Sequence, residues 1–353
     1  MTPLAAHIGR RIAQTGPLTL AEYMAECLLH PTMGYYTTRD PLGAAGDFIT
    51  APEISQMFGE LIGLCLAQAW LDQGRPDPFV LAELGPGRGT LMADLWRATA
   101  GVPGFHAAAR ICLVEASPVL RAVQAKHFPD ARWYDTVAEL PPAPLFLVAN
   151  EFFDALPIRQ FLRDGPGWRE RVVGLMPDGK LGFGQTAMSP LTALVHRLED
   201  TADGDMVETC APATAIAATI GTRLVAHGGL ALIIDYGDWR SLGDTFQALR
   251  GHEPADPLEA PGSADLTAHV DFEAIAKAAA PARHSRLCPQ GLFLERLGIS
   301  ARAEALARNL SDARLAAHIA GYRRLTHADE MGLLFKVMSL YPEGSSTPPG
   351  LEA

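Results

Sequence analysis

A run of glycines after an apolar segment is the feature of the sequence with the most definite chemistry. From position 79 the chain has the sequence FVLAELGPGRGTLMADL, in which an apolar segment ends in an acidic residue and a helical segment begins at Thr90. Glycine lets the backbone turn tightly and leaves no Cβ in the way of a ligand that approaches the helix N-terminus. We therefore predict a ligand-binding turn that comprises Glu83, Gly85, Pro86, Gly87 and Gly89.

The spacing of these glycines separates two classes of nucleotide ligand. The dinucleotide fingerprint G-x-G-x-x-G would place its third glycine at position 90, where the chain has Thr90. A nicotinamide-dependent dehydrogenase is therefore disfavoured. The observed order, acidic-x-G-x-G-x-G, resembles the first motif of class I S-adenosylmethionine (SAM)-dependent methyltransferases, which bind a nucleoside that carries an amino acid and no pyrophosphate. For the glycines taken alone, a strand–helix turn without a ligand is the alternative.

Two further acidic residues follow the next predicted strands. Glu115 ends the run ICLVE, and Asp135 follows Trp133 and Tyr134. A carboxylate at the first position suits the two hydroxyls of a ribose, and one at the second could accept from an adenine amino group. The interval from Glu83 to Glu115 exceeds the usual ~20 residues, and we assign the excess to the surface loop TAGVPGFHAAA. The acids at successive strand ends favour a nucleoside site, although Glu115 alone could be a solvated strand end.

A polar cluster follows the next apolar run. The sequence LFLVANEFFDALPIRQF places Asn150, Glu151 and Asp154 directly after a strand. Transfer of a methyl group from a sulfonium is an in-line displacement, so the enzyme mainly positions the acceptor and excludes water. For a guanidinium acceptor, with a pKa above ~12, two carboxylates can bind the planar fork and favour loss of its proton. The alternative is that these acids cap the next helix or pair with Arg159 and Arg163.

Three other polar segments lie in predicted loops. The segment from Gly46 leads into a helix that Thr50 or Glu53 could cap. Asp235 ends the fifth strand at the same edge of the predicted sheet. His269, in the segment ADLTAHVDF, is the histidine that we predict to act in the reaction, and a purely structural histidine is the alternative.

The charge and the cysteines exclude several classes of partner. Lysine and arginine number 29 against 40 aspartate and glutamate, a net charge of -11. This balance disfavours a protein that binds nucleic acid through its phosphates. The five cysteines are scattered without a CxxC pair, so we expect reduced thiols and no metal site.

No segment is apolar enough to be a membrane span. The most apolar stretch, residues 54–71, contains Ser55, Gln56, Glu60 and Gln68, whereas a span needs ~20 nearly uncharged residues. The N-terminal sequence MTPLAAHIGRRIAQTG has neither the apolar core of a signal peptide nor the composition of an import leader. We therefore expect a cytoplasmic protein.

Four apolar runs, which alternate with helical segments, predict the fold class. The runs are residues 79–84, 111–114, 145–149 and 230–234. Strands buried in a parallel sheet are typically continuous apolar runs, and alternation with helices is typical of a doubly wound sheet. We expect an α/β, Rossmann-like fold with a mostly parallel seven-stranded sheet, whose last two strands form an antiparallel pair at one edge.

Seven segments together resemble, in order and spacing, the MidA family of SAM-dependent methyltransferases. They are GDFITAPEISQMFGELIG, LAELGPGRGTLMADL, LVEASPVLRAVQ, VANEFFDALPIRQF, IIDYG, ADLTAHVDF and MGLLFKVM. The resemblance extends from about His30 to Tyr341. Mitochondrial members of this family are assembly factors for respiratory complex I, and they symmetrically dimethylate an arginine on one of its subunits.

The resemblance implies a cofactor, a product and a set of site residues. SAM would be the methyl donor, S-adenosylhomocysteine (SAH) the product, and a protein arginine the acceptor, with a complex I subunit as the family's substrate. The motifs assign to the SAM site Gly85, Gly87, Gly89 and Glu115. A segment that would fold over the cofactor contributes Asp47, Thr50, Pro52, Glu53 and Ser55. The residues that would face the acceptor are Asn150, Glu151 and Asp154.

The resemblance and the composition together predict the domain organisation. We expect residues 1–75 to form a helical cap with a cofactor-covering loop, and residues 76–341 to form the methyltransferase core, with insertions at about 155–212 and 290–325. Residues 342–353, PEGSSTPPGLEA, have the composition of a disordered tail. Because no import leader is recognised, we expect a bacterial-type enzyme.

Two other functions stay open at this point. The protein could be a SAM-binding assembly or interaction factor with little catalysis, or a methyltransferase that acts on small molecules. Transfer of label from SAM to protein, to small molecules or to neither distinguishes the three. No feature of the sequence sets the oligomeric state.

Overall fold

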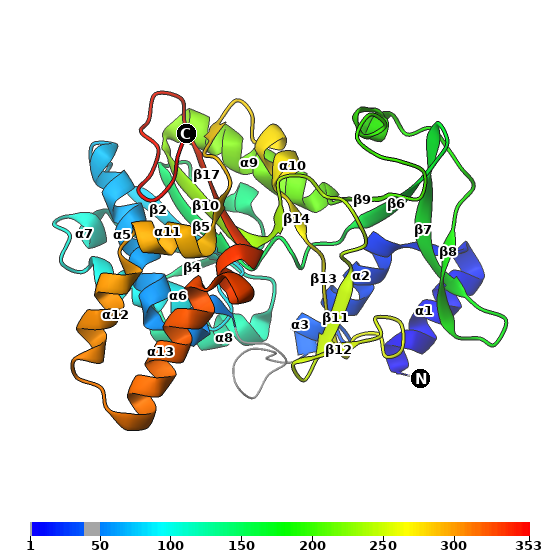
Figure 1. The fold of residues 1–353 in the computed structure, drawn as a ribbon, viewed down its shortest axis with the longest axis horizontal. Coiled ribbons are helices and arrows are strands. Elements are labelled where there is room, and N and C mark those ends of the chain that lie inside the picture. The colour runs from blue at the N-terminus through cyan, green and yellow to red at the C-terminus, as the bar shows by residue number, and fades with distance from the viewer. Residues whose placement is uncertain (1, 39–49) are drawn as a thin grey trace. The chain divides into compact units, whose positions relative to one another are not determined.

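The computed structural model describes residues 2–38 and 50–353 and divides into two compact units, each of which is described by itself. The N-terminal unit comprises residues 2–38, 154–213 and 240–271. The sheet unit comprises residues 50–153, 214–239 and 272–353. Each unit is therefore assembled from separate stretches of the chain, as the colours of Figure 1 show.

The sheet unit is built around a sheet with the strand order β15-β17-β10-β5-β2-β3-β4 (Figure 1). The five strands from β10 to β4 pair in parallel, whereas β17 is antiparallel to β10, and β15 and β16 are antiparallel to β17. The bounds are β2 (Phe79–Leu84), β3 (Ala109–Val114), β4 (Arg132–Tyr134), β5 (Leu145–Asn150), β10 (Gly229–Asp238), β15 (Arg283–His284), β16 (Cys288–Pro289) and β17 (Phe335–Tyr341). The predicted α/β class with a mostly parallel sheet is confirmed.

The apolar runs form the central strands because those strands are buried. Every residue of β2 and of β5 is buried, as are the first seven residues of β10. A parallel sheet is covered on both faces, so its central strands need apolar side chains throughout. The continuous apolar character of these runs is therefore a direct consequence of their place in the sheet.

Helices follow the strands along the sheet unit. Their bounds are α4 (Ala51–Ile54), α5 (Gln56–Asp72), α6 (Thr90–Thr99), α7 (Phe105–Ala108), α8 (Pro118–His127), η1 (Val137–Glu139), α10 (Phe272–Ala278), α11 (Gln290–Arg296), α12 (Ile299–Ala307), α13 (Asp312–Thr326) and η3 (Ala328–Gly332). Helix α9 (Ala211–His227) begins in the N-terminal unit and continues in the sheet unit.

Helix α5 packs unusually closely on α6, the helix that follows the glycine turn. A Cβ on Gly59 would lie 2.7 Å from Cβ of Asp94, and one on Gly63 would lie 2.9 Å from Cα of Leu95. These distances are shorter than Cβ contacts allow, so the two helices can approach only because both positions are glycine. The pair Gly59 and Gly63 therefore sets the position of α6.

A buried carboxylate joins α12 to α5 and α6. Glu60 of α5 accepts from Arg97 at 2.9 Å and from Arg302 Nε at 2.7 Å. Burial raises the pKa of Glu60, but the hydrogen bonds from Arg302 and Arg97 outweigh it, and the net pKa is lowered. Helices α12 and α13 lie side by side in Figure 1, and this ion pairing attaches the first of them to the core.

The N-terminal unit combines short helices with two small sheets. The strand orders are β1-β7-β6-β9, with β8 paired to β7, and β12-β11-β13. The bounds are α1 (Pro3–Thr15), β1 (Leu18–Thr19), α2 (Leu20–Leu29), α3 (Tyr35–Thr38), β6 (Arg159–Asp164), β7 (Gly167–Leu175), β8 (Leu181–Gln185), η2 (Thr192–Arg197), β9 (Met206–Thr209), β11 (Gln247–Arg250), β12 (Glu253–Ala255), β13 (Asp265–Thr267) and β14 (Val270–Asp271). Strands β7 and β8 form an antiparallel hairpin in which Leu175 and Leu181 are register partners.

Three regions differ from what the sequence suggested. Helices α4 and α5 group with the sheet unit and not with an N-terminal cap. The segment ADLTAHVDF, which we placed in a predicted loop, contributes β13 to the sheet β12-β11-β13. The expected disordered tail has contacts with the sheet unit, since Cys65 Sγ lies 3.6 Å from the carbonyl oxygen of Pro349 and Arg286 N–H donates to Glu352. Its composition precludes regular structure but does not prevent Leu351 from packing on the core.

Among the described residues, no helix is both long enough and apolar enough to cross a membrane.

Replacement of Gly63 by alanine tests the close approach of α5 and α6. In an open helix this change stabilises by roughly 0.5–1 kcal/mol. Here the added Cβ would meet the Leu95 backbone at 2.9–3.0 Å, so we expect a loss of about 1–3 kcal/mol in the free energy of unfolding. Denaturant unfolding measures it, with Gly101→Ala, where a Cβ meets nothing within 4 Å, as the control. A stabilised Gly63→Ala protein would contradict the proposed contact.

Candidate functional site

The glycine turn follows the carboxyl end of β2 and has a backbone conformation that residues other than glycine rarely adopt. Gly85, Gly87 and Gly89 have φ values of 59°, 54° and 83°. A Cβ on Gly85 would also lie 2.9 Å from the ring of Phe152, which follows β5. The turn therefore needs glycine for its backbone conformation and, at Gly85, for space. Pro86 closes the turn by accepting from Gly89 N–H at 2.7 Å.

Glu83, the last acidic residue before the turn, is buried with an unused oxygen. Its side chain is 4% exposed, and Oε2 has no hydrogen-bond partner among the described residues. Burial, together with the charge of Glu115, raises the pKa of Glu83 to about 8. A buried acid of this kind suits a ligand that brings a hydrogen-bond donor or a positive charge. The unused oxygen of Glu83 therefore fits a nucleoside that carries an amino acid, whose ammonium group is both a donor and a positive charge.

Gln124 connects the glycine turn to the end of β3. Its Nε2 donates to the carbonyl oxygen of Gly87 at 2.7 Å and to Oε2 of Glu115 at 3.2 Å. Its Oε1 accepts from Trp133 Nε1 at 2.8 Å, and Glu115 also accepts from Ser117 N–H at 2.7 Å. Sequence reasoning missed Gln124, because a glutamine inside a helix is ordinarily a surface residue.

Asp135 is exposed, unlike Glu83 and Glu115, the two other acids predicted to bind the cofactor at strand ends. Its carboxylate is exposed and pairs with Arg121, whose Nε also donates to the carbonyl oxygen of Glu115 at 2.7 Å. Asp135 therefore follows β4 at the expected edge of the sheet, and the role that we predicted for it in adenine binding stays a prediction.

Glu151 stands at the end of β5 in a strained backbone conformation. Its φ is 50°, which is rare for a residue with a side chain. Oε1 of Glu151 accepts from Ala51 N–H at 2.8 Å and from Nδ2 of Asn150 at 3.0 Å. The other side-chain atom of Asn150, Oδ1, is buried and has no hydrogen-bond partner within the described chain. Residue 84 of β2 is the register partner of residue 149 of β5. Asn150 and Glu151 therefore lie at the same edge of the sheet as the glycine turn.

Asp235 on β10 holds the turn that follows Glu151. The Asp235 side chain is fully buried, and its Oδ2 accepts from the N–H groups of Phe152 at 3.1 Å and Phe153 at 2.9 Å. Glu151 N–H donates to the carbonyl oxygen of Ile234 at 2.9 Å. The end of β10 thus fixes the backbone on which Glu151 lies.

The segment 50–55 contacts both sides of this site. Glu53 accepts from the hydroxyl of Thr90, at the start of α6, at 2.5 Å. Ser55 caps α5 through its hydroxyl, which accepts from Met57 N–H at 3.3 Å. Thr50 precedes α4 without a side-chain capping bond, and Pro52 lies in its first turn. Asp47, which we predicted to be in the same segment, lies outside the described residues.

Asp154 and His269 belong to the N-terminal unit and not to the unit that holds Glu151. The carbonyl oxygen of Asp154 accepts from Ala268 N–H at 3.0 Å. The N–H of His269 donates to the hydroxyl of Thr245 at 2.8 Å, and its side chain is half-buried. The expected grouping of Asp154 with Asn150 and Glu151 therefore rests on the sequence alone.

Arg159, one of the alternative partners for these acids, is bound elsewhere. Its Nε donates to Glu170 at 2.6 Å, and a second bond joins the same two side chains. Arg163 lies over the ring of Trp168 at 5.6 Å. This geometry gives no support to pairing of Glu151 with either arginine.

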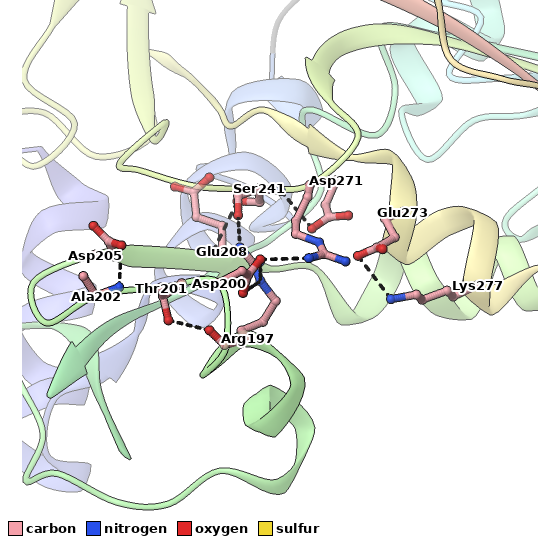
Figure 2. A network of polar contacts seen from close by, with 11 residues as sticks. Arg197, Asp200, Thr201, Ala202, Asp205, Glu208, Ser241, Asp271, Glu273 and Lys277 are labelled. Atoms are coloured by element: carbon pink, nitrogen blue, oxygen red, sulfur yellow. Dashed lines mark hydrogen bonds and ion pairs between the residues drawn. The ribbon is translucent and has the colours of Figure 1, made fainter. Parts of the chain in front are cut away.

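A polar network that the sequence did not reveal surrounds β9 in the N-terminal unit. Figure 2 shows Arg197, which donates to Asp200 at 3.1 Å and to the carbonyl oxygen of Ser241 at 2.8 Å. The hydroxyl of Ser241 accepts from Glu208 N–H at 3.3 Å. Burial raises the pKa of Glu208, although bonds from Thr245 and from a neighbouring amide oppose the shift. These contacts hold the segment that leads to His269.

Comparison with known proteins gives a matching family. Residues 61–288 match the family model described as "Putative S-adenosyl-L-methionine-dependent methyltransferase". A curated relative from Danio rerio, "Protein arginine methyltransferase NDUFAF7, mitochondrial", is 37% identical over 95% of this chain and 86% of its own length. The protein of the same name from Homo sapiens is 36% identical over 97% of this chain and 84% of its own length.

A solved structure has the same fold. A methyltransferase-like protein from Burkholderia thailandensis, crystallised with SAH bound, superposes with a TM-score of 0.83 at 29% identity. The superposition covers 98% of this chain and 93% of that one. The resemblance to the MidA family and the expected SAM cofactor are therefore confirmed.

The expected cytoplasmic location is contradicted. The curated relatives from Danio rerio and Homo sapiens are both named as mitochondrial proteins. Our prediction relied on the lack of a recognisable leader, and that feature does not report where a protein works.

The family model covers most of the chain, and the curated relatives match nearly all of it. In this chain the glycine turn, with positive φ at Gly85, Gly87 and Gly89, follows Glu83, a buried acid with an unused oxygen. This chain belongs to the family of SAM-dependent methyltransferases.

Proposed function

We propose that the protein transfers methyl groups from SAM to an arginine side chain of a protein substrate. The observation that carries this proposal is the position of Glu151. This residue directly follows β5, the strand paired with β2, and so lies at the same edge of the sheet as the glycine turn. Curated relatives that match nearly the whole chain are named protein arginine methyltransferases, which supports the same acceptor.

The chain's own residues suggest how the cofactor would be held. The proposed cofactor residues are Glu83, Gly85, Pro86, Gly87, Gly89, Glu115 and Asp135, with the covering segment Asp47, Thr50, Pro52, Glu53 and Ser55. Glu83 would accept from the ligand through its unused oxygen, and Glu115 would accept from the ribose. SAM supplies a methyl group on a sulfonium, an electrophile that needs no further activation by the protein.

The acceptor side needs positioning and a destination for a proton. A guanidinium has a pKa above ~12, so the attacking nitrogen must lose a proton as the N–C bond forms. Glu151 would accept a hydrogen bond from this nitrogen and take that proton. Asn150 would orient the substrate through its buried Oδ1. Asp154 and His269 stay predicted acceptor-side residues.

The protein substrate is a further step of the proposal. The resemblance to the MidA family implies a subunit of respiratory complex I and a symmetric dimethylarginine product, so such a subunit is the acceptor to test first. A net charge of -11 is favourable for a basic, arginine-containing peptide and unfavourable for nucleic acid.

Replacement of Gly87 by valine should abolish binding of SAM and SAH. A β-branched residue at a φ of 54° is strongly disfavoured, and its methyl groups would occupy the face that the ligand approaches. The backbone term alone is about 1–2 kcal/mol, which weakens binding about tenfold before any clash is counted. Calorimetry with SAH measures the loss, and Gly101→Val serves as a control outside the turn. Unchanged affinity in Gly87→Val would rule out this turn as the cofactor site.

Binding of the cofactor should release a proton from Glu83. With a pKa of about 8 this carboxyl is mostly protonated at pH 7, and a positively charged ligand beside it favours the ionised form. Calorimetry at pH 7 in two buffers of different ionisation enthalpy should show release of close to one proton, and Glu83→Gln should remove it.

The same group makes the unliganded protein less stable at higher pH. Its pKa is raised above the ordinary value of 4.5, so its contribution to stability is fully present below that value and is lost as the pH rises toward 8.

In the calorimetric test, binding heats that do not depend on the buffer would contradict the assignment of Glu83 to the cofactor.

Glu151→Gln should retain SAH binding and lose methyl transfer by roughly 10²–10⁴-fold, since the amide cannot take up the proton. The assay is transfer of labelled methyl from SAM to arginine-containing proteins. The matched control is Glu199→Gln, on an exposed residue. Full transfer by the Glu151 variant would show that its role is wrong.

The wild-type assay also tests the proposed function. Label in small molecules alone, or in neither fraction while SAH still binds, would overturn the protein substrate.

A further inference from the structure

Two histidines and a glutamate meet on the first two helices of the N-terminal unit. His7 lies on α1, Glu26 on α2, and His30 directly after the last residue of α2. One ligand atom from each lies within 4.8 Å of the others. Nε2 of His7 is 3.8 Å from Oε2 of Glu26, and the two imidazole rings are 5.2 Å apart at 76°. All three side chains are half-buried, so they can be reached from solvent.

Helix periodicity and the core of the unit bring these residues together. Glu26 and His30 are four positions apart, the spacing that places side chains on one face of a helix. His7 precedes Ile8 on α1, and Ile8 belongs to the same apolar cluster as Cys27 of α2. The packing of this cluster therefore places His7 beside α2. The three ligands therefore come from two helices whose packing is fixed independently of them.

The charges around Glu26 leave one of its oxygens for a ligand. Arg11 donates to Oε1 of Glu26 at 2.7 Å and to Glu22 at the same distance. Because Arg11 is shared between two carboxylates, the local charge stays negative. Its bond to Oε1 orients the carboxylate so that Oε2 faces His7, as outer hydrogen bonds commonly do for metal ligands.

We propose that His7, Glu26 and His30 bind a divalent transition-metal ion of the zinc type. Two imidazole nitrogens and one carboxylate oxygen suit Zn²⁺, Co²⁺ or Ni²⁺, whereas Ca²⁺ and Mg²⁺ prefer oxygen ligands throughout. Three protein ligands leave the remaining positions to water. The ion would link α1 to α2 and stabilise their packing.

The ligand atoms need only small movements to close on an ion. Ligands about 2.0–2.2 Å from zinc lie roughly 3–3.5 Å from one another, so the observed distances must shorten by about 1 Å. Rotation of half-buried side chains provides this. The nearest competing bond is weak, since Thr32 N–H donates to Nδ1 of His30 at 3.3 Å. A metal ion on Nε2 of His30 would place the imidazole proton on Nδ1, which could then no longer accept from Thr32 N–H. Only this one long contact would be lost.

Titration of the full chain with Co²⁺ tests the site, since cobalt reports its ligands through visible absorption and competes with Zn²⁺ for the same position. We expect one Co²⁺ per chain, displaced by Zn²⁺. His7→Ala, His30→Ala and Glu26→Gln should each weaken affinity at least about tenfold, because loss of even an outer partner costs 10–100-fold. His227→Ala, on an exposed histidine of α9, should bind as the wild type does.

Two results would overturn the proposal. One is wild-type protein without cobalt absorption at millimolar metal. The other is absorption that persists in all three ligand variants. Retained SAH binding in each variant shows that the protein is folded, so that lost metal affinity is assigned to the missing ligand.

Discussion

The missing side chain at Gly85 is the constraint on which the site depends. A Cβ there would meet the ring of Phe152, so the turn after β2 and the turn after β5 are packed directly against each other. Asp235 fixes the second turn by accepting from the N–H groups of Phe152 and Phe153. Three neighbouring strands are therefore locked together at their carboxyl ends, so the turn after β2 cannot move without the turn after β5.

The central sheet was predictable because its buried strands have continuously apolar sequences. Runs such as residues 79–84 and 145–149 are apolar at every position, as strands covered on both faces require. The sheet β12-β11-β13 was not predictable, because its strands are three or four residues long and two of them, β11 and β12, are partly exposed. The C-terminal segment was misjudged for a related reason, since composition reports propensity and not the contacts that Leu351 finds.

The positions of the candidate site residues were predictable where a residue lies at the end of an apolar strand. Glu83, Glu115 and Glu151 all lie at the expected edge of one sheet. Gln124 was missed because its importance comes from three hydrogen bonds formed across the fold. Asp154 was grouped with Glu151 by proximity in sequence; its backbone carbonyl accepts from Ala268 of the N-terminal unit, and its predicted role stays a prediction.

Glu60 gives the helical segment 299–326 a dependence on acidity that its sequence does not suggest. The carboxylate is shared by two guanidinium groups and has a lowered pKa, so the pairing persists in neutral solution and fails as the pH falls through that pKa. Protonation would remove the anion that Arg97 and Arg302 share and would leave Arg97 paired with Asp94 alone. Acid would thus detach α12 from α5 before it disturbs the apolar sheet, and the C-terminal helices would unfold first.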